Sequence, residues 1–252
     1  MSFTGALQFL TRIPIKHTAA PATRAAMAPW FPVVGALIGG VVGGIAAGFQ
    51  YWMTPLAAAA IAVVAGMLVS GAFHEDGLAD LSDAVAGGAT RDRRFEILKD
   101  SRLGTYGTVA VAGSIITRVA ALAGLATVGP AAAVVGAVAS HALARGIAVG
   151  VIGFAPAASP DGLGASFRSD VSRTRAVVTV AVGIGIAAVG TGWWAGPMLG
   201  VAALAATAVS VVATRALGGV TGDVAGAVEQ VAEIAALLAA SALAARHGIW
   251  WR

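Results

Sequence analysis

Long apolar runs alternate with short polar segments along the chain. Each run approaches the roughly 20 residues that an α-helix needs to cross a hydrocarbon core about 30 Å thick. The last run is opened by two acidic residues, Glu229 and Glu233. The pattern predicts an all-α fold, a polytopic membrane helix bundle with about six to seven transmembrane helices. The apolar runs cover residues 31–49, 55–73, 108–127, 131–152, 176–194, 197–214 and 231–246.

The composition agrees with a membrane protein. Apolar residues make up 58% of the chain, charged residues only 11%, and the mean hydropathy is +0.85. In a typical soluble domain about a quarter of the residues are charged. We therefore expect residues 1–252 to form a single integral domain in the lipid bilayer. The absence of cysteine excludes disulfides and thiolate metal sites.

The cationic residues are spread unevenly among the polar segments. The turns near 50–54, 128–130 and 195–196 carry no charge. The cations form no patch interleaved with aromatic residues, so the basic balance does not indicate a nucleic-acid partner. Most of the cationic residues lie before the first apolar run or after the second and fourth apolar runs. They are Arg12, Lys16, Arg24, Arg91, Arg93, Arg94, Lys99, Arg102, Arg168, Arg173 and Arg175.

These charges predict an orientation. Under the positive-inside rule the N-terminus is cytoplasmic, together with the segments near 74–107, 154–175 and 215–230. The same three segments, with their edges, contain all twelve acidic residues, and residues 74–107 alone hold seven. We predict that they form cytoplasmic active-site loops.

The densest acidic motif has a helical spacing. Asp76, Asp80 and Asp83 stand at i, i+4 and i+7, which places three carboxylates on one helix face. Carboxylates this close repel one another unless a cation lies among them. Oxygen ligands favour Mg²⁺, and Gly77 leaves room for a phosphate to approach. The alternative is an acidic helix end solvated at the membrane surface.

Two neighbours of the motif have more than one interpretation. Glu75 is rotated by about 100° from Asp76 on a helix, so it could serve a second ion or face solvent. His74 could bind a metal, act as a base, or form a structural hydrogen bond at the membrane interface.

A cationic cluster follows the motif. Lys99, Asp100, Ser101 and Arg102 supply two cations and a hydroxyl beside a carboxylate. Such a cluster suits phosphate oxygens, and Arg102 could bind a phosphate through two hydrogen bonds.

A third polar segment precedes the last apolar run. In Leu217–Asp223, two glycines allow a tight turn whose backbone N–H groups could face a phosphate. Asp223 could be a metal ligand, a base or a plain helix cap. Glu229 lies on one helix face with Glu233, where acids are costly and usually functional. Near the span ends, Arg118, Arg145 and Arg215 could reach the interface or pair with these acids.

Four strings, in order over about residues 3 to 240, resemble the motifs of the cobalamin synthases, also called adenosylcobinamide-GDP ribazoletransferases. The strings are Phe9-Leu10-Thr11-Arg12-Ile13-Pro14, then Phe73-His74-Glu75-Asp76-Gly77-Leu78-Ala79-Asp80 with Asp83, then Ile97–Gly107, and finally Leu217–Asp223.

The resemblance implies an activity and a location. It implies a multi-pass enzyme of the bacterial inner membrane that uses Mg²⁺ and whose active site faces the cytoplasm. Such an enzyme joins adenosylcobinamide-GDP to α-ribazole or α-ribazole 5′-phosphate, releases GMP and completes the nucleotide loop. Other cobalamin-assembly enzymes are candidate partners.

The resemblance also implies roles for residues. Asp76, Asp80 and Asp83 correspond to metal-binding carboxylates, and the segments Lys99–Arg102 and Thr221–Asp223 correspond to substrate contacts. The base that accepts the ribose hydroxyl proton would be Asp83 or Asp223.

Three further residues are candidates beside these. His74 and Glu229 are candidate substrate contacts. Glu75 is a further candidate metal ligand, although the resemblance does not imply this role because position 75 is often apolar in the family.

Two other classes compete with this assignment. A CDP-alcohol phosphotransferase also uses a helical aspartate-rich motif, but its Asp-Gly-x-x-Ala-Arg string is absent because Asp80 follows Ala79. A divalent-cation transporter predicts acids buried in mid-span, whereas the sequence pattern places the acids in loops and at span ends.

Overall fold

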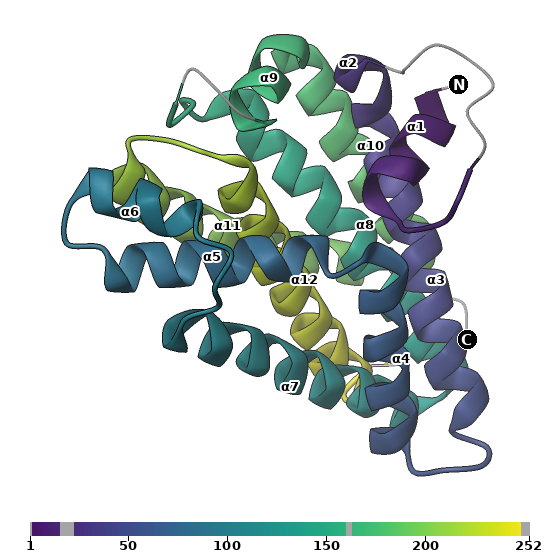
Figure 1. Ribbon diagram of the computed structural model, residues 1–252. Helices are drawn as coiled ribbons and strands as arrows, with labels where there is room; N and C mark the ends of the chain where they lie inside the picture. The colour runs from purple at the N-terminus through teal and green to yellow at the C-terminus, as the bar shows by residue number, and fades with distance from the viewer. Residues whose placement is uncertain (1, 16–22, 160–162, 248–252) are drawn as a thin grey trace.

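The computed structural model describes residues 2–15, 23–159 and 163–247, and this part of the chain is almost entirely helical (Figure 1). The predicted all-α class is confirmed. Lys16, one of the cations used to predict the orientation, lies outside the described residues. The helices are α1 (Ser2–Leu10), α2 (Arg24–Met27), η1 (Ala28–Trp30), α3 (Phe31–Phe49), α4 (Pro55–Ser70), α5 (Phe73–Gly87), α6 (Arg91–Leu98), α7 (Thr105–Val128), α8 (Pro130–Phe154), α9 (Leu163–Asp170), α10 (Arg173–Thr191), η2 (Gly192–Trp194), α11 (Ala195–Leu217) and α12 (Gly222–Ala244).

The helices have the lengths of a multi-pass membrane protein. Within the described residues, five segments are long and apolar enough to cross a membrane, or six if the bent pair α4–α5 is one span. The expected runs 176–194 and 197–214 both fall in one segment, Arg173–Leu217. That segment is interrupted at Gly192, whose backbone (φ 59°, ψ −129°) is not helical. Large exposed apolar side chains, such as those of Leu68 and Leu204, suit contact with lipid.

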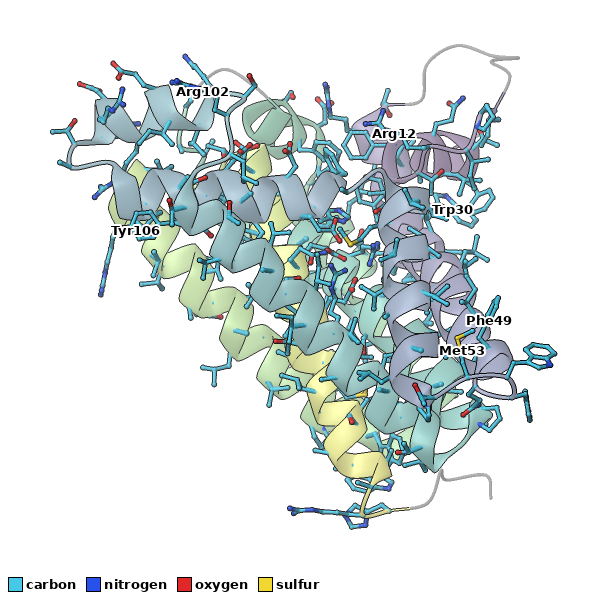
Figure 2. All side chains as sticks on the ribbon, turned by 60° about the horizontal axis from the view of Figure 1, so that its bottom comes forward. Arg12, Trp30, Phe49, Met53, Arg102 and Tyr106 are labelled. Atoms are coloured by element: carbon cyan, nitrogen blue, oxygen red, sulfur yellow. The ribbon has the colours of Figure 1, made fainter. Side chains whose placement is uncertain are left out.

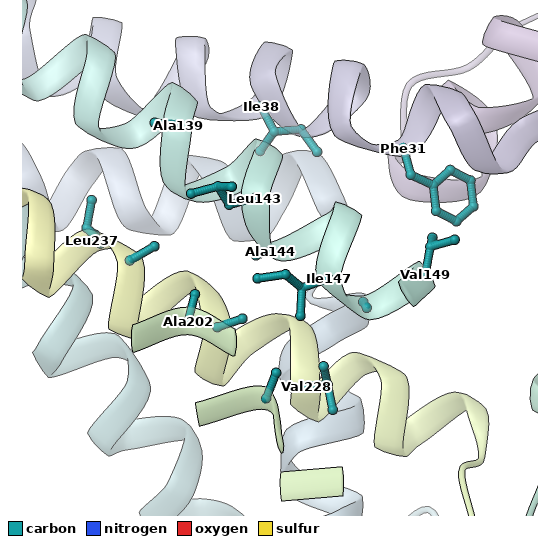
Figure 3. Packing of buried hydrophobic residues seen from close by; sticks show 14 of the residues in the cluster. Phe31, Ile38, Ala139, Leu143, Ala144, Ile147, Val149, Ala202, Val228 and Leu237 are labelled. Carbon is teal, nitrogen blue, oxygen red and sulfur yellow. The ribbon is translucent and has the colours of Figure 1, made fainter. Parts of the chain in front are cut away.

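Two helices form the centre of the bundle. Helix α8 packs against α3, α10 and α12, and α12 also packs against α5, α7 and α11. Figure 3 shows Leu143 and Ile147 of α8 between Ile38 of α3 and Val228 of α12. Helices α3 and α8 approach so closely that a Cβ atom at Gly39 would lie 2.5 Å from the Ala137 carbonyl oxygen. Small residues therefore set this contact, as is common between membrane helices.

The chain turns sharply between α4 and α5. The expected run 55–73 ends as a helix at Ser70, and Gly71 (φ 69°) and Ala72 (φ 55°) adopt left-handed conformations. The Ala72 N–H donates to the Met67 carbonyl at 2.8 Å, which closes the end of α4. Helix α5 then leaves at 90° and runs across one end of the bundle (Figure 1). The segment near 74–107, expected as a loop, therefore contains two helices, α5 and α6.

Helix α6 is fixed to the ends of two other helices. The Arg91 guanidinium donates to the carbonyls of Leu217 at 2.8 Å and Ala158 at 2.7 Å, and that of Arg94 donates to Ala216 at 3.0 Å. The loops after α8 and α11 also join, because the Val220 N–H donates to the Pro156 carbonyl at 2.8 Å. The end of the bundle that carries α5 and α6 is thus cross-linked by hydrogen bonds.

Candidate active site

The aspartates of α5 lie on its outward face. Asp76 is exposed and Asp80 and Asp83 are half-buried, while Gly77 and Leu81 on the other side are buried against the bundle. The predicted helical placement of the three carboxylates is confirmed. Since α5 crosses the bundle end, this face is directed away from the apolar core.

The first turn of α12 lies against α5 at Gly77. A Cβ atom at Gly77 would lie 2.7 Å from the Asp223 carbonyl oxygen and 3.2 Å from the Cα atoms of Asp223 and Gly226. No side chain fits in this space. Because Gly77 has no side chain, Asp223 can lie next to the turn of α5 that carries Asp76, although the two aspartates are far apart in the sequence.

Thr221, rather than Asp223, caps α12. The Thr221 hydroxyl accepts the Val224 N–H at 3.2 Å and lies 3.3 Å from Asp223 Oδ2, to which it can donate. The helix begins at Gly222, so Asp223 stands in its first turn. The interpretation of Asp223 as a plain helix cap is therefore wrong.

The carboxylates of α5 and α12 influence one another. Burial, followed by the charges of Asp76, Asp223 and Asp83, raises the pKa of Asp80 to about 7. Helix α5 is not one of the five spanning segments, so this carboxyl group lies at the bundle end. The negative charges around Asp80 oppose its ionisation, and a cation bound among them would offset this repulsion.

Asp83 holds the start of α7. One of its carboxylate oxygens accepts the Gly104 N–H at 2.7 Å, and the other accepts the Gly107 N–H at 2.9 Å. Asp83 thereby satisfies N–H groups at the beginning of a helix, as a capping side chain does. It also fixes the segment after Arg102 against α5.

The predicted cationic cluster lies at the surface, in the segment that joins α6 to α7. The Arg102 side chain donates to both carboxylate oxygens of Asp100, from Nε to Oδ1 at 3.0 Å and from Nη2 to Oδ2 at 2.6 Å. The Arg102 side chain hydrogen-bonded to Asp100 lowers the pKa of that carboxyl to about 2. Lys99 and Ser101 are exposed. Figure 2 shows Arg102 at the same end of the molecule as Arg12.

A second polar constellation lies inside the bundle, between α5, α7, α8 and α12. Arg118 Nη2 lies 2.8 Å from Glu75 Oε1, and its Nη1 lies 3.4 Å from Glu233 Oε1. Arg145 forms ion pairs with both Glu229 and Glu233. We call this set the buried ionic network: His74, Glu75, Arg118, His141, Arg145, Glu229 and Glu233, all of which are buried.

The histidines complete the buried ionic network. His74 Nδ1 lies 3.2 Å from Glu229 Oε2, and His141 Nδ1 lies 2.8 Å from Glu233 Oε2. The predicted pairing of Arg118 and Arg145 with interior acids is confirmed, whereas Arg215 is exposed. No sequence pattern indicated a role for His141, because its acidic partner, Glu233, lies on another helix.

The placement of these acids corrects two expectations. Glu75 does not face solvent, because it is buried with Arg118. Glu229 and Glu233 are buried inside α12 rather than at the edge of a loop. A cation transporter would use buried acids to bind its ion. Here Glu229 and Glu233 are instead paired with arginine.

The candidate site residues thus fall into three groups. Asp76, Asp80 and Asp223, with Thr221, form a carboxylate cluster at the crossing of α5 and α12. His74, Glu75 and Glu229 belong to the buried ionic network. Lys99, Asp100, Ser101 and Arg102 lie at the surface, beyond the Gly104 and Gly107 N–H groups that Asp83 binds.

The carboxylate cluster offers fewer ligands than a complete metal site. Within the described ranges, no three or more histidine, aspartate or glutamate side chains converge so as to hold a metal ion by themselves. Mg²⁺ keeps several waters and is usually bound through one or two carboxylates plus substrate phosphates. One or two carboxylates of the cluster of Asp76, Asp80 and Asp223 would match that coordination, with the remaining ligands coming from outside the protein.

Comparison with known proteins gives one family. The family model described as cobalamin-5-phosphate synthase matches residues 2–241. A protein of Azorhizobium caulinodans named adenosylcobinamide-GDP ribazoletransferase is 38% identical, and the match covers 96% of each chain. A protein of Klebsiella pneumoniae with the same name is 34% identical, over 94% of this chain and 98% of the relative. No solved structure matches the chain.

Proposed function

The chain belongs to the cobalamin-5-phosphate synthase family, and from this premise we propose how it carries out the ribazole transfer that completes the nucleotide loop of cobalamin. The donor is adenosylcobinamide-GDP and the acceptor is α-ribazole or α-ribazole 5′-phosphate. The acceptor hydroxyl oxygen forms a bond to the phosphorus attached to cobinamide. The bond between that phosphorus and the bridging oxygen breaks, and GMP leaves with the bridging oxygen.

The carboxylate cluster supports the proposal that this reaction depends on Mg²⁺. The donor pyrophosphate and the carboxylates are all negatively charged, so they repel one another without a cation. Bound Mg²⁺ would supply the positive charge that offsets the charge on the pyrophosphate oxygens. Asp76 and Asp80 would hold it from the exposed face of α5, where a water-soluble substrate has access.

We assign the general base to Asp223. Both oxygens of Asp83 already accept backbone N–H groups, so this carboxylate is engaged in holding the start of α7. The carboxylate of Asp223 accepts a single backbone N–H, its own, and lies 3.3 Å from the Thr221 hydroxyl. Asp223 would accept the proton of the ribose hydroxyl as the new phosphorus–oxygen bond forms.

We place the reaction on the cytoplasmic side of the bacterial inner membrane. The cations at the end of the bundle with α5 and α6, together with the uncharged turns of the opposite end, support this orientation under the positive-inside rule. Exposed Lys99 and Arg102 would attract the phosphates of the donor to this end.

The observation that carries the mechanism is the contact of α12 with α5 at Gly77, which brings Asp223 to the aspartates of α5. Its test is the release of GMP from adenosylcobinamide-GDP and α-ribazole by the purified protein. We expect Asp76→Asn and Asp80→Asn each to reduce turnover by at least about 100-fold, because a metal ligand is lost. Chelation of divalent cations should abolish turnover, and added Mg²⁺ should restore it.

A matched control is Asp92→Asn, because Asp92 is exposed in the first turn of α6 and lies outside the cluster. This variant should retain the turnover of the parent protein. If Asp76→Asn or Asp80→Asn turned over normally at saturating Mg²⁺, the metal assignment would be wrong, whereas the transferase activity itself would stand.

A further inference from the structure

A groove lies on the outside of the bundle, where the last turn of α8 passes the C-terminal half of α11. It is a cavity of about 490 Å³ that is open along one side, and small-molecule sites typically measure about 300–1,000 Å³. Its α11 residues stand three, four and eight positions after Thr207, so they share one helix face. We call this cavity the lateral groove, and its lining includes Val151 and Phe154 of α8 and Thr207, Ser210, Val211 and Arg215 of α11.

One end of the lateral groove is cationic. Arg215 lines it, is exposed, and forms no ion pair with any residue that the structure describes. The Arg173 guanidinium lies 6.0 Å from the centre of the Phe154 ring, at the edge of the same groove. The three helices that carry these side chains, α8, α10 and α11, contain no aspartate or glutamate. The two arginines therefore complement an anion that these helices do not supply.

The rest of the lateral groove is apolar in effect. The hydroxyls of Thr207 and Ser210 each donate at 2.7 Å to carbonyls of their own helix, so neither requires a polar ligand. From Thr207 to Arg215 the α11 axis rises roughly 12 Å. One leaflet supplies about 15 Å of the hydrocarbon core. The groove therefore has the length and the polarity of one half of a bilayer.

The cationic end of the lateral groove lies where lipid headgroups would be. Arg215 stands two residues before the end of α11, and Arg91 of α6 binds the carbonyl of the last residue of that helix, Leu217, at 2.8 Å. This end therefore belongs to the side of the bundle that carries α5 and α6. The groove runs from there along α8 and α11, both of which belong to segments apolar enough to span a membrane.

We propose that the lateral groove binds one anionic phospholipid, with its phosphate at Arg215 and Arg173 and an acyl chain directed toward Thr207. Arginine binds phosphate oxygens through charge-assisted hydrogen bonds, and basic pockets between membrane helices bind anionic headgroups. A zwitterionic lipid gains less, because its own cation lies beside the phosphate.

A second copy of the chain fits the lateral groove less well. A twofold contact through this face would place the same patch of each copy against the other. Because α8, α10 and α11 carry arginines at this end and no acids, the contact would bring like charges together. An anionic lipid meets both the charge and the apolar length.

The first test compares lipids on the purified protein in lipid-free detergent. Phosphatidylglycerol should raise the Tm with increasing concentration, and native mass spectrometry should detect one tightly bound molecule. Phosphatidylcholine with the same acyl chains should have a much smaller effect, and glycerol 3-phosphate, which has no acyl chains, should have none. Arg215→Gln should weaken the affinity for phosphatidylglycerol by at least about fivefold, the contribution of one arginine at an anionic lipid surface. The control Arg246→Gln should not, because Arg246 is exposed beyond the opposite end of α12.

The second test fills the lateral groove. Val211 lines it and Val212 does not, although the two valines are neighbours with similar exposed fractions of 42% and 47%. Val211→Trp should weaken phosphatidylglycerol binding by at least about fivefold, whereas Val212→Trp should leave it unchanged. Both variants should unfold like the parent protein without lipid. Equal binding of the two lipids, an equal effect of glycerol 3-phosphate, equal behaviour of the two tryptophan variants, or a dimer that only Val211→Trp dissociates would each overturn the proposal.

Discussion

Asp223 is available for chemistry because a neighbouring side chain caps its helix. The Thr221 hydroxyl accepts the Val224 N–H, which would otherwise be one of the unsatisfied donors at the start of α12. Asp223 stands in the first turn of α12, close enough to α5 for its charge to act on Asp80. At the scale of one residue, Thr221 caps the helix, and in the proposed mechanism Asp223 accepts the proton.

This division predicts the effect of Asp223→Ser. Thr221 continues to cap α12, so the variant should insert and fold normally. Turnover should fall by at least about 100-fold, the range for a lost general acid or base. GMP release and membrane content, measured on the same preparation, check this. A well-folded variant with normal turnover would show that Asp223 does not share a site with Asp76.

Some roles at this scale were predictable from the sequence and others were not. Helix periodicity is local, so spacing alone placed Asp76, Asp80 and Asp83 on one face. Spacing could not reveal that Asp83 binds the N–H groups of Gly104 and Gly107. Nor could it reveal the partner of Glu75, because tertiary packing brings Arg118 to it.

At the scale of elements, the right-angle turn before α5 decides where the aspartates lie. A continuous apolar run through residue 73 predicts a straight span, because hydropathy carries no information about direction. The two left-handed residues Gly71 and Ala72 end α4 early, and α5 then lies across the bundle end. If α4 continued straight, the three aspartates would extend away from α12.

The turn predicts a difference between two glycines. A Cβ atom at Gly71 would collide with the Arg12 side chain and occupy a left-handed conformation, whereas a Cβ atom at Gly113 in α7 would meet nothing within 4 Å. Gly71→Ala should lower the free energy of unfolding by at least about 1 kcal/mol and reduce turnover. Gly113→Ala should leave turnover intact and stabilise α7 by up to about 1 kcal/mol. Unfolding and GMP release in detergent measure both effects, and equal behaviour of the variants would contradict the role of the turn.

At the scale of the whole molecule, the buried ionic network connects four helices. Arg118 of α7 pairs with α5 and α12, and Arg145 of α8 pairs with α12. The sequence indicated that these arginines could find acidic partners, but the set that meets depends on how the helices cross. The network adjoins the carboxylate cluster, since His74 and Glu75 directly precede Asp76 on α5.

Removal of one member of this network should be costly. Arg145→Met removes the arginine partner of Glu229 and leaves Glu233 with Arg118 as its remaining arginine, and breaking a buried pair in this way costs about 3–5 kcal/mol of stability. Arg215→Met is the control, because Arg215 is exposed at the end of α11. Thermal unfolding in detergent compares the two variants. If they were equally stable, the network would contribute nothing to the fold.

The orientation of the whole molecule can be tested with single cysteines, because the chain has none of its own. Ala89, between α5 and α6, and Tyr51, between α3 and α4, are both exposed. In intact cells an impermeant thiol reagent should modify Tyr51→Cys and spare Ala89→Cys. In inverted vesicles the pattern should be reversed. The opposite pair of results would overturn the cytoplasmic placement of the carboxylates.

The buried ionic network also sets an order of assembly. Arg118 meets Glu75, which is 43 residues earlier in the chain, but Arg145 pairs with Glu233, which is 88 residues later. During synthesis α8 therefore enters the bilayer before its acidic partners exist, at a cost of about 2.5–3.5 kcal/mol for an arginine at mid-membrane. Only the arrival of α12 neutralises that charge. A copy truncated before α12 would keep the Arg145 guanidinium within the membrane without its acidic partners.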